Sequence, residues 1–224
     1  MIQFRSVMSG RAGSARGFTL VELLIVVAII SILMSVLVPA AWSALKTARQ
    51  SAATQSSHGI GEMLSQYGID NGSYPDATSS TDAFKMLISK GYLTSANIFY
   101  LPNGGQTKFT GTSPATNLTA QNVSWDITGM TGTNGPAGIS VNAPDELPIV
   151  FSTGGTVNYP AQPGPGSATC TAAGPLSTDG LAVTYKDTHA EFVKVDSAAG
   201  TYTISNFIPG SFDPKGQTYV QRKP

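Results

Sequence analysis

The sequence predicts an α+β protein in which a long N-terminal helix leads into a C-terminal antiparallel β-sheet head. We expect the first half of this helix to be exposed and its second half to pack on the sheet. Three observations support the prediction: an apolar run over 18–42, a helical continuation to about residue 67, and strand-like segments late in the chain. A chain of 224 residues with 41% hydrophobic content can bury the core of one globular domain with appended segments.

The N-terminal part of the chain has the features of a membrane anchor. Residues 1–17 contain Arg5, Arg11 and Arg16 and no acidic residue, and the run 18–42 is almost wholly apolar. A helix over that run would be about 37 Å long and could cross a hydrocarbon core of about 30 Å. Basic residues before the run place the preceding segment in the cytoplasm and the head outside. An ordinary secretory signal would be cut after the apolar run, whereas here the distinctive residues precede it.

Two residues interrupt the apolar run. Glu22 places a carboxylate on an apolar helix, which costs a few kcal/mol unless the carboxylate finds a partner. The alternative is that Glu22 lies near the headgroups of a plain signal anchor. Pro39 removes a helical hydrogen bond and is expected to kink or locally melt the helix.

The second half of the helix is expected to be amphipathic and to end near Tyr67. Its apolar stripe is predicted to contain Ala41, Leu45, Ala48 and Ala52, followed by Ile60, Met63, Leu64 and Tyr67.

The head is predicted to contain one short helix, a loop-rich insertion and a late sheet. The helix covers 82–88, with Ser80 or Thr81 as its cap. The segment 103–143 is rich in Gly, Thr, Asn and Ser and is predicted to be a variable surface insertion with one strand-like piece at 123–127. The strands are expected at 147–151, 180–185, 190–195 and 202–207, the middle two forming a hairpin that turns at 186–189.

The side chains that could perform chemistry are few. Cys170 is the single cysteine, so no internal disulfide can form, and no nucleophile signature connects it with His189. Asp179, Asp187 and Glu191 are weak candidates for a calcium site, although solvated turn acids are the favoured interpretation. No metal site or cofactor is therefore assigned.

The charge pattern gives no support for nucleic-acid binding. Thirteen basic residues balance thirteen acidic ones, and the basic residues do not cluster with aromatic residues. No glycine loop of the phosphate-binding type is present.

The string Gly17-Phe18-Thr19-Leu20-Val21-Glu22-Leu23-Leu24 resembles the class III signal of type IV pilins and type II secretion pseudopilins. The resemblance implies that a prepilin peptidase cuts between Gly17 and Phe18 and methylates the new N-terminus at Phe18. It also implies that Glu22 sets the register between subunits by pairing with the Phe18 amine of a neighbour. Many members of the family carry a proline at the position of Pro39.

Two segments of the head carry further resemblances. Residues 67–75, which include Asp70-Asn71-Gly72 and Tyr74-Pro75, look like the segment after the long helix of the major pseudopilin of type II secretion. Residues 182–192 resemble a hairpin of many prepilin-like proteins, with Thr188 in place of the expected glycine. That replacement puts a tight turn with positive φ in doubt.

Together these features divide the chain into a cytoplasmic leader (1–17), a long helix (18–67, transmembrane over about 18–42) and an extracytoplasmic head (68–224). The leading interpretation is a pseudopilin of a type II secretion-like system rather than an enzyme. It would be stored in the bacterial inner membrane with its head in the periplasm and then polymerise into a filament that drives protein export. The expected partners are other copies of the chain, the prepilin peptidase, an inner-membrane assembly platform, minor pseudopilins or pilins, and the lipid bilayer.

Two alternatives remain. The first is a type IV pilin whose surface filament serves adhesion, motility or DNA uptake. The second is a membrane-anchored enzyme or binding module whose N-terminus mimics a prepilin.

Overall fold

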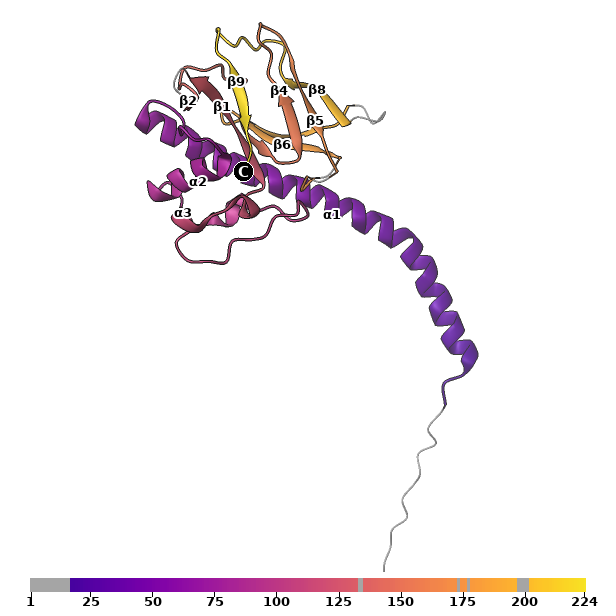
Figure 1. Cartoon of the computed structure of the whole chain (residues 1–224). Helices are drawn as coiled ribbons and strands as arrows, with labels where there is room; N and C mark the ends of the chain where they lie inside the picture. The colour runs from indigo at the N-terminus through magenta and orange to yellow at the C-terminus, as the bar shows by residue number, and fades with distance from the viewer. Residues whose placement is uncertain (1–16, 133–134, 173, 177, 197–201) are drawn as a thin grey trace, which may run out of the picture. The chain divides into compact units, whose positions relative to one another are not determined.

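The computed structural model describes residues 17–132, 135–172, 174–176, 178–196 and 202–224. The predicted leader therefore lies outside the described residues, except for Gly17. The chain divides into two units, Met1–Leu45 and Lys46–Pro224. In chain order (Figure 1), the elements are α1 (Leu20–Asn71), α2 (Ser80–Ser89), η1 (Ala96–Phe99), α3 (Pro114–Asn117), η2 (Ala120–Asn122), β1 (Trp125–Gly132), β2 (Gly135–Ala137), β3 (Pro148–Ser152), β4 (Gly155–Asn158), β5 (Gly166–Cys170), β6 (Gly180–Tyr185), β7 (Ala190–Lys194), β8 (Tyr202–Ile208) and β9 (Tyr219–Arg222).

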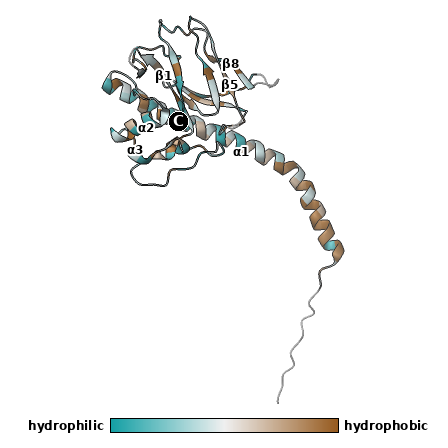
Figure 2. Cartoon of the chain, viewed as in Figure 1, coloured by the Kyte–Doolittle hydropathy of each residue, from teal (hydrophilic) through white to brown (hydrophobic). Residues whose placement is uncertain are grey.

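The first half of α1 is an exposed apolar helix, as predicted. Every residue from 20 to 45 is exposed, and Figure 2 shows this half as predominantly hydrophobic. By length and composition, α1 is the helix in the described part of the chain that could cross a membrane. The helix continues through Pro39 without interruption, so local melting does not occur there. The kink at Pro39 remains a prediction.

The second half of α1 contributes one face to the core of the head. Its buried face repeats every three to four residues, through Ala53, Ser57, Ile60, Leu64 and Tyr67. The predicted stripe was wrong in its first part, because the bulky residues further along the helix set the packing face. Its exposed members are Ala41, Leu45, Ala48 and Ala52. The helix also runs past Tyr67 to Asn71 and ends where Gly72 adopts a φ of 78°.

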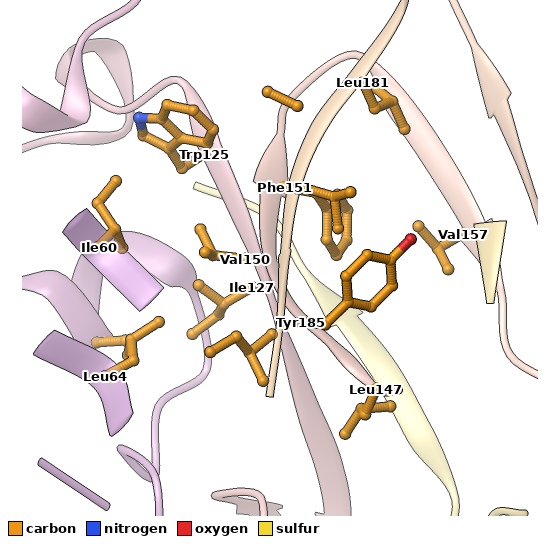
Figure 3. Close-up of a cluster of buried hydrophobic side chains, with 14 of the residues drawn as sticks. Ile60, Leu64, Trp125, Ile127, Leu147, Val150, Phe151, Val157, Leu181 and Tyr185 are labelled. Atoms are coloured by element: carbon orange, nitrogen blue, oxygen red, sulfur yellow. The ribbon is translucent and has the colours of Figure 1, made fainter. Parts of the chain in front are cut away.

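A close contact fixes how α1 lies on the sheet. A Cβ placed on Gly61 would collide with the Thr184 side chain of β6, so glycine is needed at this helix–sheet contact. Figure 3 shows Ile60 and Leu64 on the same side of the sheet as Ile127, Val150 and Trp125.

The larger sheet has six antiparallel strands in the order β2-β1-β3-β6-β7, with β9 also paired to β1. Ile127 pairs with both Val150 of β3 and Arg222 of β9, and Met130 pairs with both Ala137 of β2 and Tyr219 of β9. A residue has one partner on each side, so β3 and β2 share one edge of β1 and β9 covers the other.

The position of β1 corrects the predicted insertion over 103–143. Trp125, Asp126 and Ile127 are buried inside the sheet, so this part of the segment is structural core rather than a surface insertion. The expected strand-like piece at 123–127 begins two residues later and extends to Gly132.

A second sheet, β4-β5-β8, packs on the face opposite to α1. Phe151 contacts Phe207 edge to face at 5.7 Å, and the Tyr185 hydroxyl donates to the Phe207 carbonyl at 3.0 Å. In Figure 3, Phe151, Val157, Leu181 and Tyr185 lie on this side of the large sheet. The head therefore has three layers: helix, large sheet and small sheet.

The predicted hairpin is confirmed. β6 pairs with β7 in register, and the strands predicted at 147–151 and 202–207 correspond to β3 and β8. Val183 and Tyr185 of β6 are buried, whereas Phe192 and Val193 of β7 are half-buried. The expected turn forms because Thr188 adopts a φ of 68°, despite its branched Cβ.

The short helix predicted at 82–88 is present as α2, but its cap is Ser79 rather than Ser80 or Thr81. The Ser79 side chain accepts a hydrogen bond from the Asp82 amide, and Ser80 and Thr81 are buried inside the first turn.

Candidate functional site

The residues predicted to be functional at the start of the chain lie at the first turn of α1. The Glu22 carboxylate accepts hydrogen bonds from the Thr19 amide at 2.9 Å and from the Thr19 hydroxyl at 2.7 Å. In return, the Thr19 hydroxyl oxygen accepts from the Glu22 amide at 3.3 Å. This is a reciprocal capping box, and it holds the Glu22 carboxylate at the N-terminal end of the helix.

Glu22 is surrounded in sequence by exposed apolar side chains. Phe18 is 75% exposed, and Leu20 and Leu23 are 78% and 58% exposed. None of the ion pairs found in the described residues includes Glu22. The chain therefore presents a carboxylate and a wide apolar surface together, and in the described structure the carboxylate accepts its hydrogen bonds from Thr19.

Nothing in the described part of the chain requires a glycine at position 17. A Cβ built on it would meet nothing within 4 Å, and its backbone is not in the left-handed region. Substituting Gly17 would therefore leave the fold of the described residues unchanged. A requirement for glycine here would come from another molecule.

Thr19 was missed by the sequence interpretation. Its signal is present, because Thr19-Leu20-Val21-Glu22 has the Ser/Thr-x-x-Glu pattern that precedes an apolar helix.

The three weak calcium candidates are not brought together. Asp179 precedes β6 and forms an ion pair with Lys46 at 2.6 Å. Asp187 lies in the turn after β6 and accepts a hydrogen bond from the His189 amide at 2.8 Å. Glu191 accepts from the Tyr185 hydroxyl at 3.3 Å. No group of three or more His, Cys, Asp or Glu side chains suited to a metal occurs among the described residues. The three acids are turn and surface residues, not a shared site.

Cys170 is not poised as a nucleophile. It lies on β5 with 5% of its surface exposed, and burial raises its pKa to about 11. His189 is exposed in the β6–β7 turn and stacks on Tyr185. A thiol with a raised pKa remains protonated at neutral pH and reacts slowly.

Asp126 is a buried carboxylate that sequence reasoning also missed. It is 1% exposed on β1, and burial raises its pKa to about 7, opposed by a hydrogen bond from the Gln221 amide. The alternating pattern of the strand gave no sign that Asp126 is buried. Its apolar neighbours Trp125 and Ile127 face α1, and alternation places Asp126 on the other face of the sheet.

Comparisons with known proteins agree with the N-terminal features. Residues 13–38 match the family model described as the prokaryotic N-terminal methylation motif. The chain is 43% identical over 88 residues to the type IV wide pilus major component PilA4 of Thermus thermophilus. The match covers 39% of this chain and 63% of the relative, so it spans less than two thirds of the relative's length. No solved structure matches the chain. With the long apolar helix and the antiparallel head described above, these matches make the chain similar to type IV pilins in its N-terminal part.

Proposed function

We propose that this chain is a filament subunit that is cut after Gly17, methylated on Phe18 and polymerised through the exposed half of α1. The observation that carries the proposal is the apolar surface over residues 20–45, which no part of the described chain covers. Such a surface needs lipid before assembly and neighbouring helices afterwards. The methylation motif at residues 13–38 supports the cut and the methyl group.

Membrane insertion would precede assembly. The basic residues Arg5, Arg11 and Arg16 favour a cytoplasmic leader, and α1 is long and apolar enough to span the bilayer. The head would then lie outside the cytoplasm. Catalysis has no place in this proposal, and the energy for extraction from the membrane would come from a separate motor.

Glu22 would set the register between neighbouring subunits. Cleavage after Gly17 creates a positive amine on Phe18, and a neighbour shifted axially by about one helical turn of ~5.4 Å would bring that amine near Glu22. In apolar surroundings, a paired charge is far less costly than an unpaired one. The capping box with Thr19 supports this role, because it already holds the carboxylate at the end of the helix where the amine would arrive.

Two filament types fit this subunit. The similarity to a type IV wide pilus major component favours a surface pilus. The segment Asp70-Asn71-Gly72 to Tyr74-Pro75 favours a secretion pseudopilus. Neighbouring genes would distinguish them: a secretin with several pseudopilins would indicate secretion, and a retraction motor would indicate a pilus.

Intact-mass analysis of the chain from its own cells tests the processing step. We expect a mature chain that begins at Phe18 and carries one added methyl group. Gly17→Val should abolish this product, whereas the matched leader substitution Gly10→Val should leave it unchanged. A full-length wild-type chain would overturn the proposal, and mature product from Gly17→Val would place the cut elsewhere.

A further inference from the structure

The side chain of Gln221 joins the two sheets of the head. Gln221 lies on β9 of the large sheet, and its amide nitrogen donates to the Gly155 carbonyl of β4 at 2.9 Å. Its side-chain oxygen accepts from the Val157 amide of the same strand at 3.1 Å. β4 is an outer strand of the small sheet and pairs with β5 on its other side. The Gln221 amide therefore takes the position that a neighbouring strand would have at the edge of β4.

Asp126 is the third member of this contact. The Gln221 nitrogen also donates to Oδ2 of Asp126 at 2.5 Å, so both hydrogens of the side-chain amide are used. Asp126 lies on β1, the strand that pairs with β9, and is buried. Its other oxygen, Oδ1, is buried without a hydrogen-bond partner in the described chain. We refer to Asp126, Gln221 and the backbone of Gly155 and Val157 as the inter-sheet contact.

The charged and titratable side chains around Asp126 come from the residues that follow β9 and β4. Lys223 is exposed, and its positive charge favours the ionised form of Asp126. Tyr159 is a second titratable group close to Asp126, and it stays neutral because burial raises its pKa. On β9, alternation places Arg222 on the opposite face of the sheet from Gln221. The other side chains that line the adjoining pocket are neutral: Gln106, Thr153, Thr156, Thr171 and Pro224.

A protonated Asp126 fits the inter-sheet contact better than an ionised one. A neutral carboxyl group can be buried with one hydrogen bond, whereas a carboxylate in the same place has lost its water and gains one donor, Gln221. Burial accordingly raises the pKa of Asp126 from 3.8 to about 7, although Gln221 and Lys223 oppose the rise. A carboxyl group that water reaches ionises at about pH 4. A rise in pH from about 4 to 7 therefore favours any arrangement that exposes Asp126, and a further rise adds little.

We propose that the inter-sheet contact is a pH-sensitive switch, which is closed while Asp126 is protonated and releases Gln221 from the edge of β4 when Asp126 ionises. Release lets water and the Lys223 ammonium group reach the carboxylate. It also leaves the Gly155 carbonyl and the Val157 amide without their partner, so the edge of the small sheet opens to solvent. The pairing of β9 with β1 is made by backbone groups and does not depend on these side chains.

Amide hydrogen exchange of the full chain in detergent, followed residue by residue by NMR, tests the proposal. The Val157 amide reports opening directly, because its partner is the Gln221 side chain. The protection factor corrects for the intrinsic effect of pH on exchange. We expect that of Val157 to fall at least ~10-fold between about pH 5.5 and about pH 8. The amides of the central strands β3 and β6 are the internal reference and should change far less.

Asp126→Asn imitates the protonated state, because its side chain keeps an oxygen for Gln221 and carries no charge. In this variant the protection factor of Val157 should be the same at both pH values. At the higher pH it should exceed the wild-type value at least ~10-fold. Asp187→Asn is the matched control, because Asp187 is exposed in the β6–β7 turn and asparagine keeps its acceptor for the His189 amide. This control should behave as the wild type does.

The proposal would be overturned if the wild-type protection factor of Val157 did not change between the two pH values, or if Asp126→Asn lost protection with pH as the wild type does. If circular dichroism shows that Asp126→Asn is misfolded, Gln221→Leu decides the question. This change keeps a side chain of similar size but removes the hydrogen bonds to β4, so Val157 should be weakly protected at both pH values. A pH-dependent loss of protection in Gln221→Leu would show that another group controls the edge of β4.

Discussion

The Glu22 carboxylate has two successive roles, first in the single chain and then in the proposed filament. In the single chain it accepts two hydrogen bonds from Thr19 and so caps α1. In the proposed filament it also neutralises the amine that cleavage creates on a neighbouring Phe18. These two contributions depend on different properties of the side chain, because capping needs a hydrogen-bond acceptor and pairing needs a negative charge.

Substitutions at this turn separate the two contributions. Glu22→Gln keeps an acceptor for Thr19 but removes the charge, so we expect normal insertion and cleavage and roughly tenfold fewer filaments, similar to Glu22→Ala. Thr19→Val removes the hydroxyl and keeps the charge, so it should assemble far better than either. Filament yield by sedimentation and electron microscopy measures the difference. Wild-type yield from Glu22→Gln would show that charge pairing does not set the register.

Thr188 is the residue at which the backbone of the head is most clearly strained. A branched residue with a φ of 68° is unfavourable by about 1–2 kcal/mol relative to glycine, because its Cβ crowds the neighbouring carbonyl. The turn still forms because the β6–β7 pairing and the Asp187 hydrogen bond to the His189 amide hold it.

Thr188→Gly should therefore stabilise the head. We expect a rise of about 0.5–1 kcal/mol in the free energy of unfolding, after the greater flexibility of glycine in the unfolded chain is subtracted. Thr188→Ala retains a Cβ and should gain less. Denaturant unfolding of the full chain in detergent gives both values, and a loss of stability in Thr188→Gly would contradict the assigned backbone conformation.

At the level of the elements, the contact between α1 and β6 determines where the helix lies on the sheet. Gly61 permits the helix backbone to approach Thr184 more closely than any residue with a Cβ would. Because both partners are buried, the contact cannot relax by moving a side chain into solvent.

Gly61→Ala should destabilise the head by about 1–3 kcal/mol through overpacking, despite the better helix propensity of alanine. Thr184→Ala in the same chain should recover part of the loss, because it removes the atoms that collide. The neighbouring exposed change Glu62→Ala is the control and should change stability by less than ~0.5 kcal/mol. Equal stability of Gly61→Ala and the wild type in denaturant unfolding would refute the close contact.

Elements with strong hydrophobic alternation could be predicted from the sequence, and the others could not. β6 and β7 have an alternating pattern and a turn, and they were found in register. β1 lies in the segment 103–143, which was predicted to be a surface insertion because it is rich in Gly, Thr, Asn and Ser. Asp126 accepts a hydrogen bond from Gln221 of the neighbouring strand β9, and the Thr128 hydroxyl is hydrogen-bonded to the Tyr159 hydroxyl, so both partners lie far away in the sequence. A local sequence pattern does not show which distant residues form hydrogen bonds with these buried polar groups.

At the start of the chain, Gly17, Phe18 and Glu22 are named from one short string of neighbouring residues, and their roles stay predictions. The burial of Asp126 could not be predicted, because its hydrogen-bond partner Gln221 comes from a distant segment that only the fold brings next to it.

For the whole molecule, the main asymmetry is between its two units. The described residues after Leu45 bury most of their large apolar side chains in a three-layer head, whereas every residue from 20 to 45 is exposed. A soluble monomer would leave this surface in water, which is unfavourable by about 25 cal/mol per Å². Lipid and neighbouring copies of the same helix are the two environments that remove this penalty. In the proposed function, the helix lies in lipid before assembly and against neighbouring helices in the filament.

A density map of the purified filament tests this account most directly. We predict helices beginning at N-methyl-Phe18 in the filament core, with each Glu22 carboxylate within ~4 Å of the Phe18 nitrogen of a neighbouring subunit. A filament held together through the heads, with α1 outside the core or with Glu22 far from every Phe18 amine, would contradict it.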